Sequence, residues 1–266
     1  MTPSITNETA EDLATHSALD IFLKLDRRSI ALLLDVDGTL IDIGPSPFDV
    51  DVPDTLKHDL AALDRLTGGA LALVSGRPIR DLDILFAPLR LSSVGGHGAE
   101  LRIAGAEATR IGDLPDDMRR HLTGAATPGS GVDFEDKGYS VALHYRQAPQ
   151  HEDRLRAHVE ASRAAFAAEP TEVLLGKAMF EVKRPGINKG EGVRALMAQA
   201  PFKGRMPVFI GDDVTDEAAF AALPALGGKG FSVGRNFSGL SGIFSSPAQV
   251  RRALRQLARY EYFKIA

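Results

Sequence analysis

The stretch IALLLDVDGTLIDIG, residues 30–44, joins an uninterrupted apolar run to two aspartates that are two positions apart. The run from Ile30 to Leu34 is typical of a strand that is buried on both faces of a parallel sheet. Asp35 and Asp37 follow it directly, although two nearby carboxylates repel each other and are costly to bury without partners. The pattern therefore predicts a buried strand that ends at a site where cations stabilise clustered acids.

The segments around this stretch alternate between helix and strand patterns. On the N-terminal side of the chain, the expected elements are a helix over 53–68, a strand at 70–75, a helix over 78–86 and a strand at 92–96. Further along, they are a helix over 188–199, a strand at 207–211, a helix from 216, a strand at 231–234 and a helix from 247. This alternation predicts an α/β fold with a parallel sheet. Ligands of such sheets bind at the carboxyl ends of the strands.

The middle of the chain has a different pattern. Residues 132–138 and 139–146 alternate as antiparallel strands with one wet face do, and a long helix and two short strands follow. We therefore expect a small α+β domain at 110–184, inserted into a larger domain formed by 29–109 and 185–266. We expect residues 1–28 to form a helical extension, because Leu13, Ala14, Ala18, Ile21 and Leu25 recur at helical spacing.

Composition limits the class of protein. The 266 residues are 44% hydrophobic and 25% charged, which is typical of a globular chain, and the net charge of -4 argues against a general nucleic-acid binder. The absence of cysteine excludes disulfides and thiolate metal sites, and it leaves a metal site with oxygen ligands open. The N-terminus lacks a signal-peptide pattern, and no apolar run approaches roughly 18 residues. We expect a cytoplasmic protein with no membrane or nucleic-acid partner.

Four short segments at the ends of predicted core elements carry the chemistry: DVDGTL (35–40), SGR (75–77), NKGEGV (188–193) and GDDVTDE (211–217). Together they supply carboxylates, a hydroxyl, a lysine and glycines. This set suits phosphoryl transfer, because a doubly negative phosphate ester repels a carboxylate nucleophile unless a divalent metal and a lysine neutralise both. A hydroxyl and backbone amides can hold the remaining phosphoryl oxygens.

Each segment also has a simpler interpretation. An EF-hand loop begins with the same two aspartates, but its glycine is sixth and follows a helix, whereas Gly38 is fourth and follows a strand. SGR alone is a turn, Lys189 alone is a solvated lysine, and GDDVTDE alone is an acidic helix cap. Their combination at one sheet edge favours the functional interpretation.

In this order, the four segments resemble the motifs of the haloacid dehalogenase superfamily, over 30–109 and 185–266. Within it, the chain is similar to the trehalose-6-phosphate phosphatases at GGHGAE (95–100), EDKGYSVALHYR (135–146), FEVKRPGINKGEGV (180–193) and GDDVTDEAAF (211–220). The resemblance implies a HAD-like Rossmannoid parallel-sheet core with an inserted α+β cap domain. It also implies hydrolysis of trehalose 6-phosphate to trehalose and phosphate, in trehalose biosynthesis.

The resemblance implies a role for each core residue. Asp35 would be the nucleophile that forms an aspartyl-phosphate, and Asp37 would be the general acid and base. Ser75 would hold a phosphoryl oxygen, and Lys189 would neutralise the phosphate. Mg2+ would be the cofactor, bound by the Asp35 carboxylate, the Asp37 carbonyl and Asp212, while Asp213 and Asp216 would complete or support its shell.

The resemblance also implies substrate contacts. Arg77, His97 and Gly98 would lie near the sugar-phosphate entrance, although His97 between glycines is equally suited to a plain turn. The cap would bind the sugar through charged residues, which form strong hydrogen bonds to hydroxyls: Glu135, Lys137, Arg146 and Glu181. The simpler alternative for the cap residues is an ion-paired, solvated sheet face.

Two other functions stay open from the sequence. One is a phosphatase or phosphomutase for another sugar phosphate, and the other is a sugar-phosphate-binding regulator without turnover. The presence of Asp35, Asp37, Lys189 and Asp212 together counts against the regulator. We expect a monomer that acts on a small-molecule substrate.

Overall fold

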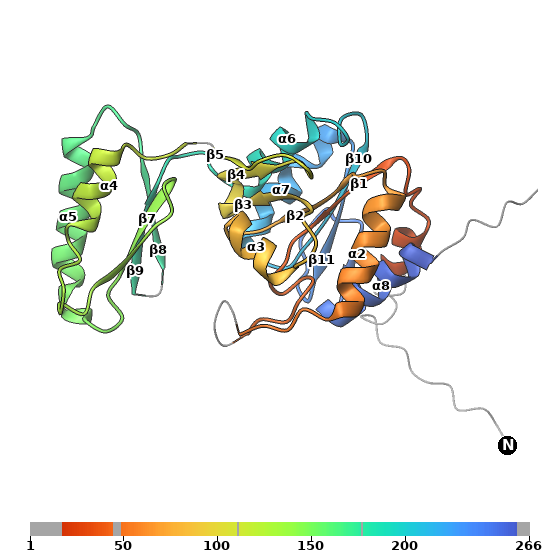
Figure 1. Cartoon of the computed structure of the whole chain (residues 1–266), viewed down its shortest axis with the longest axis horizontal. Coiled ribbons are helices and arrows are strands. Elements are labelled where there is room, and N and C mark those ends of the chain that lie inside the picture. The colour runs from red at the N-terminus through yellow and green to blue at the C-terminus, as the bar shows by residue number, and fades with distance from the viewer. Residues whose placement is uncertain (1–17, 45–48, 111, 177, 260–266) are drawn as a thin grey trace, which may run out of the picture. The chain divides into compact units, whose positions relative to one another are not determined.

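The computed structural model describes residues 18–44, 49–110, 112–176 and 178–259, and it divides into two compact units (Figure 1). The core unit comprises residues 1–109 and 188–266, and the inserted unit comprises residues 110–187.

An eight-stranded sheet forms the centre of the core unit. Its order is β12-β11-β10-β1-β2-β3-β4-β5, and neighbouring strands from β12 to β3 are parallel, whereas β4 is antiparallel to β3. The strands are β1 (Ile30–Leu34), β2 (Leu71–Val74), β3 (Ser92–Gly95), β4 (Glu100–Arg102), β5 (Thr109–Arg110), β10 (Met206–Gly211), β11 (Lys229–Val233) and β12 (Gly242–Phe244). The predicted parallel α/β core is confirmed.

Helices cover both faces of this sheet. One face packs on α2 (Asp54–Leu66), α3 (Ile79–Leu85), α8 (Pro247–Arg259) and a short helix over residues 18–23. The other face packs on α6 (Lys189–Met197) and α7 (Glu217–Ala222). Leu32 and Leu34 of β1 point into the first layer, and Ala31 and Leu33 point into the second. All four are fully buried, which explains why β1 is apolar at every position.

The inserted unit is a four-stranded antiparallel sheet with two helices. The sheet order is β6-β7-β9-β8, from β6 (Asp133–Asp136), β7 (Ser140–His144), β8 (Glu172–Gly176) and β9 (Met179–Lys183). Val141 and Leu143 of β7 share a core with Met118 of α4 (Asp116–Thr123) and Leu155 of α5 (Glu152–Ala165). The alternate positions of β7 therefore belong to the other sheet face.

Several short elements were not predicted from the sequence. They are α4, β4, β5, β12 and the 3-10 turns η1 (Gly96–Gly98), η2 (Pro149–His151), η3 (Val214–Asp216) and η4 (Pro224–Leu226). Strands of two or three residues are too short to show a period, and α4 is mostly polar, with Met118 and Leu122 as its buried residues. The predicted positions Leu13 and Ala14 lie outside the described residues.

No helix in the described parts of the chain has the length and apolar character needed to cross a membrane.

The helix over residues 18–23 contributes directly to the core. Phe22 is fully buried, and its ring meets Phe231 of β11 and Phe244 of β12 nearly at right angles, with ring centroids 5.6 and 5.8 Å apart. Such edge-to-face contacts add to the gain from burying a large apolar ring. This segment therefore completes the packing at the β12 edge of the sheet.

We expect Phe22→Ala to lower the free energy of unfolding by about 3–5 kcal/mol, because it leaves a cavity between two rings. Denaturant unfolding of wild type and variant measures this change. Ile84→Ala is the control, since Ile84 is 65% exposed and its loss should change stability by at most about 0.5 kcal/mol. A loss similar to the control would show that the N-terminal helix does not stabilise the fold.

Candidate functional site

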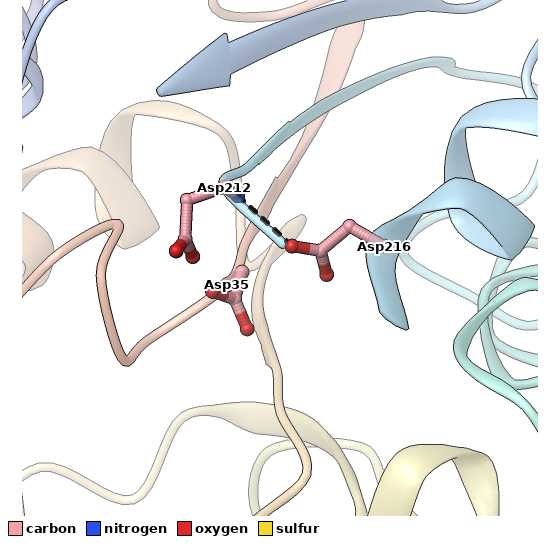
Figure 2. Close-up of side chains that lie close together, drawn as sticks. All are labelled: Asp35, Asp212 and Asp216. Carbon is pink, nitrogen blue, oxygen red and sulfur yellow. Dashed lines mark hydrogen bonds between the residues drawn. The ribbon is translucent and has the colours of Figure 1, made fainter. Parts of the chain in front are cut away.

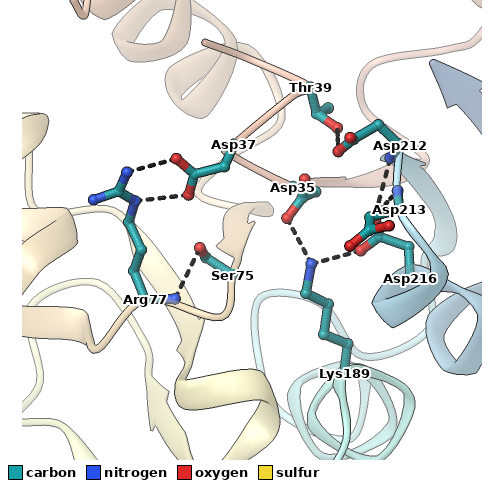
Figure 3. A network of polar contacts seen from close by, with 9 residues as sticks. All are labelled: Asp35, Asp37, Thr39, Ser75, Arg77, Lys189, Asp212, Asp213 and Asp216. Carbon is teal, nitrogen blue, oxygen red and sulfur yellow. Dashed lines mark hydrogen bonds and ion pairs between the residues drawn. The ribbon is translucent and has the colours of Figure 1, made fainter. Parts of the chain in front are cut away.

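The site lies at the carboxyl ends of neighbouring parallel strands (Figure 3). Asp35 follows β1, Ser75 follows β2, and Asp212 follows β10, while Lys189 is the first residue of α6. Because β1 lies between β10 and β2 in the sheet, the three strands deliver their following residues to one place. Asp35, Ser75 and Asp212 therefore lie at one edge of the sheet.

The loop after β1 is held by backbone hydrogen bonds. The N–H of Asp35 donates to the carbonyl of Ile210 over 2.9 Å, and the N–H of Gly38 donates to the carbonyl of Ile41 over 2.8 Å. Gly38 has a φ of +79°, and a Cβ at this position would overlap the Asp212 carboxylate. Glycine is therefore required here both for the left-handed backbone and for the close approach of the β10 loop.

A buried lysine occupies the centre of the site. The Lys189 ammonium group donates to Oδ1 of Asp35 and to Oδ1 of Asp216, each over 2.6 Å. Burial lowers the pKa of Lys189, but the charges of Asp35 and Asp216 outweigh it, so the pKa is raised overall. Lys189 is therefore a permanent positive charge in this pocket of acids.

Three carboxylates lie close together at this site (Figure 2). Oxygens of Asp35, Asp212 and Asp216 lie within 4.8 Å of one another. Burial raises the pKa of Asp35 to about 6 in spite of Lys189, and burial together with repulsion from Asp35 raises the pKa of Asp216 to about 6. Burial also raises the pKa of Asp212. One ammonium group thus leaves two of the three negative charges uncompensated, and one divalent cation would balance them.

The three carboxylates differ in their remaining contacts. Asp216 accepts the N–H groups of Asp212 and Asp213 on Oδ2, over 2.9 and 3.0 Å, so both of its oxygens are engaged. It therefore braces the β10 loop. The donor set fits a hard cation, since all groups are oxygens, and Asp35 and Asp212 are the carboxylates suited to direct coordination.

Asp37 stands apart from this cluster and pairs with Arg77. The guanidinium donates to both carboxylate oxygens, from Nε to Oδ2 over 2.6 Å and from Nη2 to Oδ1 over 2.5 Å. The buried Ser75 hydroxyl accepts the N–H of Arg77 over 3.1 Å. The structure thus connects three residues that the sequence had assigned to different roles.

Three other expected site residues lie around the cluster. The N–H of His97 donates to the Ser75 carbonyl over 3.1 Å, which holds η1 against the loop after β2. Gly98 lies against the start of α6, where a Cβ would overlap the Asn188 carbonyl. The Asp213 side chain is half exposed, 3.8 Å from Arg235, and it is not a member of the three-carboxylate group.

In the inserted unit, the expected sugar-binding residues form their own contact group. Lys137 Nζ lies 3.4 Å from Glu135 and 3.5 Å from Glu181. The Ser140 hydroxyl donates to Glu181 over 2.7 Å. Arg146 is exposed in the turn after β7 and is not a member of this group.

Sequence reasoning missed two hydroxyls that orient acids. The Thr39 hydroxyl donates to Oδ1 of Asp212 over 3.0 Å, and Ser140 holds Glu181 in the same way. Thr39 stands inside the first motif, so its place in the sequence was a signal for a role. Ser140 alternates with core residues of a strand, which indicated only that it shares the wet face.

The raised pKa values predict how pH affects the stability of the metal-free protein. The pKa of Asp35 and Asp216 is about 6 in the folded chain against an ordinary 3.8, so the folded state binds protons more tightly than the unfolded state. Their contribution to the free energy of unfolding therefore rises as pH falls from about 7 towards about 4. We expect Asp35→Asn to raise the melting temperature in chelator at pH about 7.5 by a few degrees, and by less at pH about 5.

Thermal melts of both proteins at the two pH values measure this difference. Glu160→Gln removes an exposed carboxylate from α5 and should show no such gain. A lower melting temperature of Asp35→Asn at neutral pH would contradict this prediction. It would show that the ionised Asp35 side chain stabilises the metal-free fold.

Comparisons with known proteins identify the family of the chain. A model of the trehalose-phosphatase family matches residues 33–240. The chain is 41% identical over 239 residues to the trehalose-6-phosphate phosphatase of Escherichia coli (strain K12), with 85% of this chain and 88% of that protein covered. It is 40% identical over 215 residues to a probable trehalose-phosphate phosphatase of Sinorhizobium fredii, with 80% of each covered.

A solved structure shares the fold. The C-terminal domain of a Candida albicans trehalose-6-phosphate phosphatase is similar with a TM-score of 0.64 and 24% identity, covering 98% of this chain and all of that one. The resemblance inferred from the motifs is confirmed, and the chain belongs to the trehalose-phosphatase family of phosphatases.

Proposed function

We propose that this protein hydrolyses trehalose 6-phosphate to trehalose and phosphate, through a phosphorylated Asp35 and with Mg2+ as cofactor. The observation that carries the proposal is the buried group in which Lys189 bridges Asp35 and Asp216 beside Asp212. This group holds an acid at the end of a central strand and surrounds it with the charges that phosphoryl transfer needs.

In the first step, a carboxylate oxygen of Asp35 attacks the phosphorus atom, and the bond from phosphorus to the sugar oxygen breaks. Asp37 gives its proton to the departing sugar oxygen. In the second step, water attacks the phosphorus atom and passes a proton to Asp37, and the bond to Asp35 breaks. Lys189 would hold the nucleophile and offset negative charge in both steps, and we assign the Ser75 hydroxyl to binding a phosphoryl oxygen.

Asp35, Asp212 and the Asp37 carbonyl are the groups that would hold Mg2+, with Asp216 as the brace behind them. When bound, the ion neutralises the phosphate and the carboxylates that face it. An all-oxygen donor set without cysteine or histidine favours such a hard cation.

We further propose that the inserted unit recognises the sugar. Glu135, Lys137 and Glu181 share a contact group on the sheet face opposite the helices, and Lys137 and Glu181 are mostly shielded from solvent. Charged groups that face one another can exchange an ion pair for hydrogen bonds to sugar hydroxyls. A sugar that lacks a hydroxyl at this place leaves a charged group without a partner and is rejected.

Phosphate release from a panel of sugar phosphates, with Mg2+ or with chelator, tests the proposed reaction. We expect the highest kcat/KM for trehalose 6-phosphate, no turnover in chelator, and recovery when Mg2+ is restored. Ca2+ should bind without supporting turnover, because it takes more ligands at longer metal–oxygen distances and would misplace the phosphate. Asp35→Asn is the matched inactive control, since it keeps the shape but removes the nucleophile.

A clear preference for another sugar phosphate would contradict the assignment of trehalose 6-phosphate as substrate, while the proposed reaction mechanism would stand. Full activity in chelator without bound metal, or multiple turnover by Asp35→Asn, would reject the mechanism itself.

Substitutions in the inserted unit test the source of specificity. Lys137→Ala or Glu181→Ala should lower kcat/KM for trehalose 6-phosphate by about 10- to 1000-fold, because the sugar loses charged partners. Hydrolysis of p-nitrophenyl phosphate should hardly change, since this small ester has no sugar. Glu160→Ala, which removes an exposed carboxylate from α5, is the control and matches Glu181→Ala in charge. Equal losses on both substrates would mean that these residues support the fold rather than the sugar.

A further inference from the structure

We infer that Arg77 is a positioning residue for Asp37, which it holds in the orientation needed for proton transfer. This inference rests on the proposed function, since it assigns Asp37 the proton-transfer step. The sequence-based expectation places Arg77 near the sugar-phosphate entrance, and the structure adds that its guanidinium contacts Asp37 (Figure 3).

The contact has the geometry of a two-point clamp. Nε and Nη2 of Arg77 donate to different oxygens of Asp37, over 2.6 and 2.5 Å. Two parallel hydrogen bonds fix the plane of a carboxylate, which a single bond leaves free to rotate. The Arg77 side chain is 11% exposed and that of Asp37 is 35% exposed, so the open member of the pair is the carboxylate. Its remaining lone pairs can still take part in proton transfer.

The clamp is itself held by the neighbouring strands. The N–H of Arg77 donates to the Ser75 hydroxyl over 3.1 Å, and the Arg77 carbonyl accepts the N–H of Gly96 over 2.9 Å. Two residues further on, the N–H of Ile79 donates to Glu100 over 2.6 Å. These bonds tie the loop after β2 to the ends of β3 and β4, so the guanidinium starts from a fixed backbone.

A direct role on the substrate phosphate would need a different arrangement. To grip a phosphate with the same two N–H groups, Arg77 would first have to release Asp37. The two roles therefore differ in what happens when Asp37 is already disabled. A positioning residue then has nothing left to position, whereas a phosphate ligand still contributes binding.

The test is a double-mutant cycle with Arg77→Ala, Asp37→Asn and the double variant, on trehalose 6-phosphate and p-nitrophenyl phosphate. We expect Arg77→Ala to lower kcat for the sugar ester by about 10- to 100-fold, with KM changed by less than about threefold. The burst of nitrophenol should fall much less, because this leaving group departs without a proton. The double variant should be no slower than Asp37→Asn.

Two further variants serve as controls. Arg77→Lys keeps the charge but cannot form the clamp, so it should behave like Arg77→Ala. Arg80→Ala removes an arginine that is 71% exposed on α3 and should leave all rates unchanged. Melting temperatures close to wild type would show that the variants are folded.

Additive losses in the double variant, or a loss mainly in KM on both esters, would overturn the positioning role and leave the proposed reaction intact. Activity on p-nitrophenyl phosphate and on another sugar ester, without activity on trehalose 6-phosphate, would remove the substrate assignment. The cycle would then be run on that other ester, and its result would decide the role of Arg77.

Discussion

The ion pairs of one buried lysine hold the site together. Lys189 binds Asp35 and Asp216 at equal distances, and so it joins the residue after β1 to the loop after β10. Without this charge, two carboxylates would lie buried against each other with no protein cation between them, a situation that costs several kcal/mol per ion. The same pairs still leave Asp35 and Asp216 with raised pKa values, so the site is under-neutralised by the protein alone. That deficit is the physical basis for proposing a divalent cation.

The parallel sheet makes this arrangement possible. β1 lies between β10 and β2, so the residues that follow these three strands lie close together and no long loop is needed to bring them there. Thr39 orients Asp212, Asp216 braces the β10 loop, and Arg77 clamps Asp37. Asp212 and Asp37 each have a partner of their own, whereas Asp35 and Asp216 share Lys189. A catalytic group held in this way loses little entropy when substrate binds.

The sequence predicted the sheet and the meeting of its loops because both follow from short-range patterns. The apolar run of β1, the helical spacing in α2 and the four motifs are visible without any knowledge of distant contacts. The pairing of Arg77 with Asp37 could not be predicted, since the two lie 40 residues apart and their approach depends on side-chain rotamers. Asp213 shows the same limit, because an acid beside Asp212 in the sequence turns towards solvent and Arg235. Short elements such as β4 and β12 escape detection because three residues show no period.

Because β1 is buried on both faces, its residues are constrained by packing, whereas Asp35 directly after it is constrained by its chemistry. From Ile30 to Leu34 every side chain fills one of two layers, so a polar replacement has no solvent-facing position to occupy. One peptide bond later, Asp35 leaves the sheet and its charge matters more than its volume. A mutational scan across this stretch would thus change character between neighbouring positions, from loss of soluble protein to loss of activity in a well-folded one. Beyond Asp35 the two kinds of position alternate, because Val36 and Leu40 are again buried in the core.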